Sequence, residues 1–257
     1  MRDVWNSGGV AYGAWTTIAD PVAVTLVARG GFDYTCVDLQ HGMATFGELP
    51  TILRYLMGTG TTRLVRVPSS AAAPITRALD LGAQGVVVPM VEDAEEAARA
   101  VAAARYPALP GAPETHGRRS WGPIFWDLGE APGPAEANEE VIVVVMIETP
   151  GAFAQIERIA AVPGVDVLYV GPYDFALSSG YGQATYRDNA EVEQRMRRVV
   201  DVALEHGKIP AVHCTDLQMV RDWRERGARM LTACLDTTVI AEAFAARLAG
   251  ATDTGRG

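Results

Sequence analysis

The residues best suited to chemistry stand where short apolar segments of the chain end. Glu148 follows the most apolar of these segments, in M-I-E-T, and Asp174 follows another, in V-G-P-Y-D-F. A glutamate in such a place is rarely buried unless it is paired or binds a metal. Two carboxylates with waters completing the shell suit Mg²⁺ or Mn²⁺. The alternatives are an acid stabilised by the next helix for Glu148 and a helix N-cap for Asp174.

Two further side chains could complete a reaction centre. Arg66, in V-R-V-P, places a fixed positive charge where it could neutralise a developing enolate oxygen. Its alternative role is an ion pair with Glu148 or Asp174 that only holds loops together. His41, in D-L-Q-H-G-M, carries the usual proton shuttle of neutral pH, although a loop histidine is more often structural.

Trp15 and His213 also fall at the ends of apolar segments. Trp15 is expected either to wall a substrate pocket or simply to pack at the mouth of the fold. His213 is expected either to contact substrate or to be a packed core residue. Neither choice is made by the residue types alone.

The chain contains a single lysine, Lys208, and it stands at the start of an apolar segment rather than at its end. Carbonyl chemistry needs an electron sink, which is either a lysine Schiff base or a metal that polarises the carbonyl. The position of Lys208 excludes the first route. The metal route is therefore expected.

The composition is that of a globular protein without a nucleic-acid footprint. The net charge is −9, whereas nucleic-acid binding needs a basic surface. The most apolar run near the middle of the chain, 139–147, is too short to span a bilayer, and residues 1–12 lack the features of a signal peptide. The odd number of cysteines, three, indicates reduced core thiols in a cytoplasmic protein.

Apolar runs of strand length alternate with helical patterns of 10 to 16 residues along the whole chain. This alternation predicts a parallel α/β sheet, and eight strands close a TIM barrel, (β/α)₈. We expect strands at 10–15, 34–39, 63–67, 85–89, 142–147, 167–170, 209–213 and 230–234, and helices at 22–29, 46–57, 71–81, 93–105, 151–161, 191–206, 217–226 and 238–248.

No linker divides the chain, so residues 1–248 are expected to form one barrel domain, and residues 249–257 a disordered tail. The irregular stretch 106–138 is rich in proline and glycine. A loop of this length in a compact domain is usually functional or disordered. Because it contains Arg118-Arg119-Ser120-Trp121, we expect an active-site cover or a subunit contact.

Several sequence stretches together resemble one family. They are F-D-Y-T-C-V-D-L-Q-H-G (32–42), V-R-V-P (65–68), A-L-D-L-G-A-Q-G-V-V-V-P-M-V (78–91), G-R-R-S (117–120), I-E-T (147–149), G-P-Y-D (171–174) and D-T-T (236–238). In this order they resemble the HpcH/HpaI family, whose members are metal-dependent class II pyruvate aldolases. The combination of D-x-x-H-G, I-E-T and G-P-x-D is fairly specific to that family.

The resemblance implies roles for individual residues. Glu148 and Asp174 match the ligands of a divalent metal, Mg²⁺, Mn²⁺ or Co²⁺. Arg66 matches the arginine that stabilises the pyruvate enolate, and His41 matches the acid–base histidine, oriented by Asp80. The family's 2-keto acid chelates the metal, and backbone N–H groups near Gly171, Pro172, Tyr173 and Asp174 help to hold its carboxylate.

The family is typically hexameric, a trimer of dimers, with a C-terminal helix exchanged between subunits. Asp80 ends a predicted helix and is therefore expected at the bottom of its own barrel, whereas His41 is at the top. We therefore predict that a His41–Asp80 pair crosses a subunit interface.

Three positions depart from the family pattern. Met146 stands where relatives often have glutamine, Tyr173 where the residue is commonly small, and His213 where an apolar residue is expected. These differences should reshape the pocket for the second substrate while leaving the metal and enolate residues intact.

The function implied is reversible aldol cleavage of a 4-hydroxy-2-keto acid to pyruvate, or a related 2-keto acid, and an aldehyde. The alternatives are another enolate-forming lyase or decarboxylase, macrophomate synthase-like or acting on a CoA ester, and a non-catalytic barrel that only binds. A CoA lyase would need a basic track for the nucleotide phosphates, which the sequence does not show. The retention of Glu148, Asp174, Arg66 and His41 together disfavours a non-catalytic barrel.

Overall fold

Eight strands alternate with helices along the chain in a computed structural model that describes residues 1–108 and 117–253. Most strands are short runs of mainly apolar residues, as is typical of buried parallel strands. The strands are β1 (Ala11–Thr16), β2 (Tyr34–Asp38), β3 (Thr62–Arg66), β4 (Gly85–Val88), β5 (Ile142–Met146), β6 (Val167–Val170), β7 (Ile209–His213) and β8 (Met230–Leu235).

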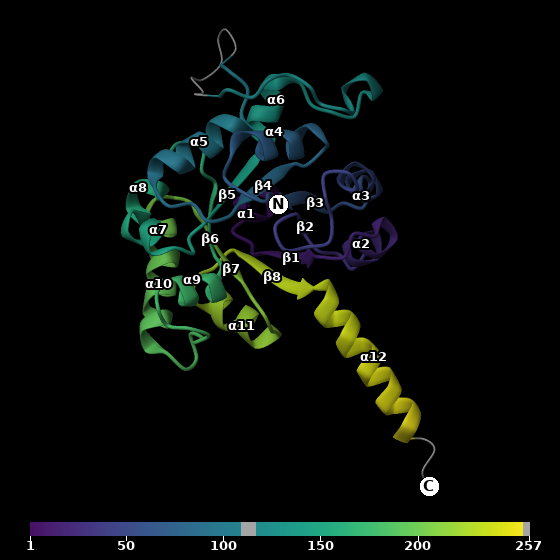
Figure 1. The fold of residues 1–257 in the computed structure, drawn as a ribbon, viewed down its shortest axis with the longest axis vertical. Helices are drawn as coiled ribbons and strands as arrows, with labels where there is room; N and C mark the ends of the chain where they lie inside the picture. The colour runs from purple at the N-terminus through teal and green to yellow at the C-terminus, as the bar shows by residue number, and fades with distance from the viewer. Residues whose placement is uncertain (109–116, 254–257) are drawn as a thin grey trace.

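Helices follow the strands and surround them in Figure 1. The helices are α1 (Arg2–Asn6), α2 (Pro21–Ala28), α3 (Leu49–Leu56), α4 (Ala72–Asp80), α5 (Ala94–Ala104), the 3₁₀ helix η1 (Trp126–Leu128), α6 (Pro134–Glu140), α7 (Pro150–Ala154), α8 (Ile156–Ala160), α9 (Pro172–Ser178), α10 (Ala190–Glu205), α11 (Leu217–Glu225) and α12 (Asp236–Asp253).

The strands form a closed parallel barrel in sequence order, with β8 paired to β1. The predicted single-domain TIM barrel is therefore confirmed. All strands run in one direction, so their carboxyl ends form one rim of the barrel, which we call the C-terminal rim. The opposite end, where the strands begin, we call the N-terminal end.

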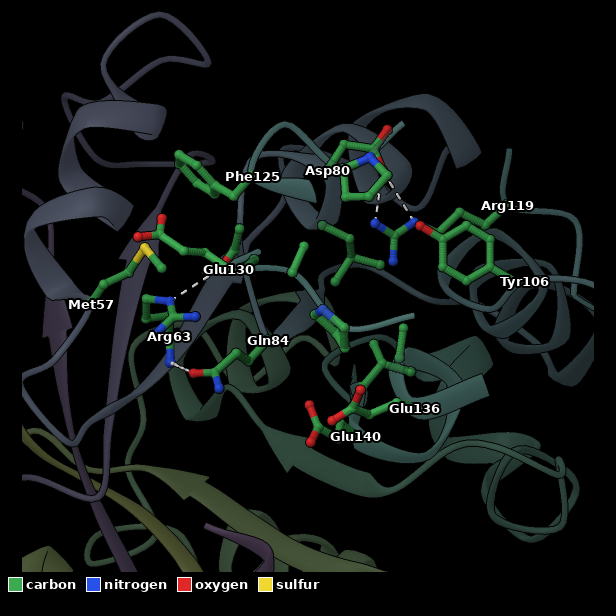
Figure 2. Close-up of a pocket in the computed structure, with 18 of the residues that line it drawn as sticks. Met57, Arg63, Asp80, Gln84, Tyr106, Arg119, Phe125, Glu130, Glu136 and Glu140 are labelled. Carbon is green, nitrogen blue, oxygen red and sulfur yellow. Dashed lines mark hydrogen bonds and ion pairs between the residues drawn. The ribbon is translucent and has the colours of Figure 1, made fainter. Parts of the chain in front are cut away.

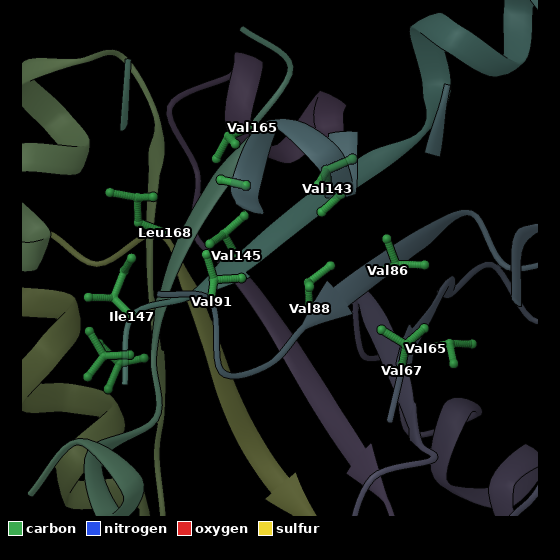
Figure 3. Packing of buried hydrophobic residues seen from close by; sticks show 14 of the residues in the cluster. Val65, Val67, Val86, Val88, Val91, Val143, Val145, Ile147, Val165 and Leu168 are labelled. Carbon is green, nitrogen blue, oxygen red and sulfur yellow. The ribbon is translucent and has the colours of Figure 1, made fainter. Parts of the chain in front are cut away.

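Two apolar clusters fill the fold on either side of the strands. On β5, Val143 and Val145 belong to the outer cluster between barrel and helices, which Figure 3 shows. Val144 and Met146 belong to the inner cluster within the barrel. The inner cluster also contains large aromatic rings, including that of Tyr34. A Cβ on Gly13 would lie 2.0 Å from the Tyr34 ring, so only glycine leaves room for that tyrosine.

The structure differs from the sequence prediction at several helices. Gln155 interrupts the helix predicted at 151–161, and the short helix α9, at the start of the β6–α10 connection, was not predicted. The stretch 106–138, predicted to be irregular, contains η1 and the start of α6. The last helix, predicted at 238–248, runs on to Asp253 as α12. Residues 254–257 of the predicted tail lie outside the described residues.

Helix α12 extends away from the barrel body in Figure 1, and every described side chain from Thr237 to Thr252 is exposed. None of the described helices is long and apolar enough to cross a bilayer. The three cysteines are free thiols, two of them buried.

Candidate active site

Asp38 and Arg66 form a buried ion pair at the C-terminal rim. They end β2 and β3 and stand directly opposite each other in the strand register. The Arg66 Nε donates to Asp38 Oδ1 at 2.9 Å, and its Nη2 makes a second short bond to Oδ2. Burial alone would raise the pKa of Asp38, but the hydrogen bond and charge of Arg66 outweigh it and lower that pKa.

The ion-pair alternative considered for Arg66 is thus correct in kind but names the wrong partner. Arg66 pairs with Asp38 rather than with Glu148 or Asp174. The guanidinium also lies 5.0 Å from the centroid of the Trp15 ring, and Trp15 Nε1 donates to Asp38 Oδ2 at 3.1 Å. A fixed cation is therefore held in place by a carboxylate on one side and a ring on the other.

The same carboxylate shapes the loop that carries His41. Asp38 Oδ1 accepts the backbone N–H of Gln40 at 2.9 Å and that of His41 at 3.2 Å. The His41 side chain is exposed at the rim. Asp38 therefore fixes both this loop and Arg66. The sequence analysis did not assign this role to Asp38.

Glu148 immediately follows β5 and is almost completely buried, with 1% of its surface exposed. Its Oε1 accepts the Met90 backbone N–H at 2.7 Å, whereas no described residue bonds its buried Oε2. Burial raises the pKa of Glu148 to about 7; the Met90 hydrogen bond and the Arg66 charge oppose this shift, and the Asp174 charge adds to it. Met90 reaches the carboxylate from a left-handed conformation with φ 54°.

Asp174 lies in the first turn of α9, where its charge helps to raise the pKa of Glu148. The N-cap of that helix is Gly171, so the N-cap alternative for Asp174 is wrong. A Cβ on Gly171 would lie 2.6 Å from Glu148 Oε2, so only glycine allows the carboxylate this position. Pro172 is buried beside it, and Tyr173 is half exposed.

These features fit a bound divalent cation. A buried carboxylate oxygen without a partner is costly, and a second carboxylate nearby raises that cost unless a cation lies between them. Among residues 1–108 and 117–253, no group of three or more His, Cys, Asp or Glu side chains is arranged to hold a metal. The two-carboxylate set, Glu148 and Asp174, leaves the other coordination positions to water and substrate oxygens.

Aromatic rings from β1, β6 and β7 lie beside the carboxylates at the rim. The His213 ring lies edge-on to the Trp15 ring, with 4.9 Å between centroids, and its Nδ1 is 3.0 Å from Tyr169 Oη. Burial, and then the nearby Arg66 charge, lower the pKa of His213 to about 4. His213 is therefore neutral and partly exposed rather than a fully packed core residue.

Asp80 and Lys208 lie at the N-terminal end, away from this site. Asp80 ends α4 and binds Arg119 Nη2 at 2.7 Å, and Lys208 Nζ donates to the Val165 carbonyl at 2.9 Å. The described part of 106–138 also lies at this end, since Ile124 N donates to the Asp80 carbonyl. The prediction that this stretch covers the active site of its own barrel is therefore wrong for its described residues.

A cavity of about 390 Å³ also lies at the N-terminal end (Figure 2). Its labelled side chains include Arg63, Gln84, Glu136 and Glu140 as well as the Asp80–Arg119 pair. We nevertheless take the C-terminal rim as the candidate site, because the Glu148 oxygen that no described residue bonds and the fixed Arg66 are there.

The fold is that of a TIM-barrel protein whose candidate site has two carboxylates, and comparison with known proteins identifies its family. Residues 11–243 match the model of the HpcH/HpaI aldolase/citrate lyase family. The chain therefore belongs to this family.

Individual relatives align over most of their length. A hydroxypyruvate/pyruvate aldolase of Delftia acidovorans is 33% identical, covering 92% of this chain and 86% of the relative. A 4-hydroxy-2-oxovalerate aldolase of Novosphingobium aromaticivorans is 34% identical, covering 92% and 88%. The crystal structure of an HpcH/HpaI aldolase/citrate lyase family protein from Burkholderia cenocepacia superimposes with a TM-score of 0.87, 29% identity and 95% coverage of both chains.

Proposed function

We propose that this protein is a class II aldolase that reversibly cleaves 4-hydroxy-2-keto acids into pyruvate, or a related 2-keto acid, and an aldehyde. The observation that carries the proposal is the buried Glu148 oxygen that no described residue bonds, at a carboxylate whose pKa responds to the charges of Asp174 and Arg66. The relatives from Delftia acidovorans and Novosphingobium aromaticivorans are both named as aldolases, which supports this reaction class.

Glu148 and Asp174 would hold the divalent cation, Mg²⁺, Mn²⁺ or Co²⁺, with open positions for the oxygens of the keto acid. When bound, such a cation polarises the substrate's keto group as a Lewis acid. Gly171, Pro172 and Tyr173 would line the side of the site that receives the carboxylate.

In the cleavage direction, the 4-hydroxyl of the substrate loses its proton to His41 through a water. The C3–C4 bond then breaks, its electron pair moves into the forming enolate of pyruvate, and C4 leaves as the aldehyde. Arg66 stabilises the enolate oxygen with a charge that Asp38 and Trp15 keep in position. A proton delivered to C3 completes the formation of pyruvate.

Two measurements test this function. Incubation with pyruvate in D₂O should exchange the C3 protons, seen by NMR, and 4-hydroxy-2-keto acids should release pyruvate. Both activities should disappear with EDTA and return with added Mg²⁺ or Mn²⁺. Activity that survives complete metal removal would contradict the class II mechanism.

We also propose that Asp80 orients His41 of a second copy within a homo-oligomer, in keeping with a hexamer. The two residues lie at opposite ends of one barrel, and no described residue bonds the His41 ring. Helix α12 offers apolar side chains at Ile240, Phe244 and Leu248 that its own barrel leaves exposed.

Subunit mixing tests this arrangement. His41→Ala and Asp80→Ala proteins, each weakly active, should recover activity when dissociated and reassembled together. Mixed assemblies would then contain sites with both residues intact. Failure to recover, although mass spectrometry shows mixed assemblies, would place Asp80 outside the site.

A further inference from the structure

A row of hydroxyl groups crosses the barrel interior and ends at the His213 ring. Tyr34 Oη lies 3.1 Å from Thr232 Oγ1, which lies 2.6 Å from Tyr169 Oη, which in turn lies 3.0 Å from His213 Nδ1. The three hydroxyl residues are fully buried. Tyr34 and Tyr169 also hydrogen-bond each other, and no described residue outside the row hydrogen-bonds the three hydroxyls.

The contact with Tyr169 bears on the tautomer of the histidine. Nδ1 lies at hydrogen-bond distance from the Tyr169 hydroxyl, which can donate to it. When Tyr169 donates, Nδ1 is bare and the proton of the neutral ring is on Nε2. We take this tautomer as the premise of the inference, and it is measured directly below.

The place of His213 on the rim indicates which substrate meets that proton. Arg66 ends β3, and the two carboxylates follow β5 and β6, where the keto acid would bind. His213 ends β7, which is next to β6 in the barrel, so it borders the keto-acid site, and the Trp15 ring touches both Arg66 and His213. No described residue bonds Nε2, and the ring is partly exposed.

We propose that His213 is a specificity-determining residue whose Nε2–H binds an oxygen of the aldehyde partner. This inference rests on the proposed aldolase function and narrows its substrate class. The preferred aldehydes carry a hydroxyl or a second carbonyl next to the reacting group, as glycolaldehyde does, and plain alkyl aldehydes such as propanal are poorer substrates. Tyr169 is a positioning residue, because it acts only by holding the tautomer of His213.

The tautomer itself is measured without any turnover. Long-range ¹H–¹⁵N NMR spectra of the ¹⁵N-labelled protein, with His213→Gln used to assign the signal, should show His213 protonated at Nε2 at neutral pH. In Tyr169→Phe, which removes the hydroxyl bonded to Nδ1, the ring should exchange between tautomers. A wild-type ring protonated at Nδ1 would overturn the inference.

Selectivity is measured as a ratio within each protein, so that any loss of overall rate cancels. Pyruvate condenses with glycolaldehyde and propanal, which have equal numbers of heavy atoms, in one competition mixture. In His213→Leu the ratio of kcat/KM should fall about two- to tenfold, as expected for one lost hydrogen bond. His213→Gln keeps an N–H donor near the same place and should restore most of the wild-type ratio.

Pyruvate deuterium exchange by the wild type separates the two ways of failing. If the wild type exchanges pyruvate but the aldehyde ratio is the same in wild type, His213→Leu and His213→Gln, the inference about His213 is wrong and the aldolase function stands. If the wild type exchanges no pyruvate with metal present, the proposed function fails, and this inference with it.

Discussion

The two ends of the barrel differ in how completely their polar groups are paired. At the N-terminal end, Asp80 forms an ion pair with Arg119, and the Lys208 ammonium donates to backbone carbonyls. At the C-terminal rim, Arg66 is paired with Asp38, but no described residue bonds one buried oxygen of Glu148. The ion pairs stabilise the chain as it stands, whereas the free oxygen of Glu148 is costly unless a cation or a proton binds it. Function is therefore expected where the internal pairing of charges is incomplete.

Glu148→Gln should give the largest effect on this contrast. Removing the carboxylate eliminates half of the proposed ligand set and with it several kcal/mol of charge stabilisation, about 10³-fold in rate. Pyruvate deuterium exchange with saturating Mn²⁺ measures the loss. Glu92→Gln is the matched control, because Glu92 is an exposed glutamate in the preceding β4–α5 loop. Equal activity in the two variants would remove Glu148 from the site.

Asp38→Asn should have the next largest effect, on folding. It leaves the guanidinium of Arg66 buried without its anionic partner, which typically costs about 3–5 kcal/mol. The control is Glu95→Gln, which breaks an exposed ion pair with Arg158 and should cost less than about 1 kcal/mol. Urea unfolding measures both variants. Similar costs would show that the Asp38–Arg66 pair is no more than a surface contact in energetic terms.

The sequence predicted the barrel well because its signals are local. Eight apolar runs alternate with helical patterns, and each run proved to be a strand within a few residues. Helix α9 was missed because its residues Pro172–Ser178 also read as a turn after β6. The Asp38–Arg66 pair was within reach of prediction, since parallel register sets neighbouring strand ends side by side.

The hydroxyl row was beyond prediction from the sequence. Tyr34, Tyr169 and Thr232 are ordinary strand residues of β2, β6 and β8, and only closure of the barrel brings them together. The left-handed Met90 that reaches Glu148 was equally hidden, because nothing in P-M-V requires a positive φ. Residue type identified Glu148, whereas three-dimensional packing was needed to explain its surroundings.

His213 should make the stability of the folded protein depend on pH. Its pKa falls from 6.5 to about 4 on folding, so the unfolded chain binds more protons between these values. The stability is therefore complete above pH 6.5 and is lost as the pH falls toward 4. Between pH 7 and 4.5 the wild type should lose about 2 kcal/mol more than His213→Gln, measured by urea unfolding. Parallel losses in the two proteins would show that the ring titrates normally.

Lys208→Met should give the smallest effect and tests the contrast from the other end. Lys208 directly precedes β7, at the end of the barrel opposite the rim. Its ammonium donates to the carbonyls of Val162 and Val165. Losing those bonds should cost about 1 kcal/mol of stability and leave pyruvate exchange unchanged. Borohydride added with pyruvate should likewise leave the wild type active. Inactivation by borohydride, with pyruvate attached to Lys208, would show that Lys208 forms a Schiff base. The metal-dependent mechanism at the rim would then be wrong.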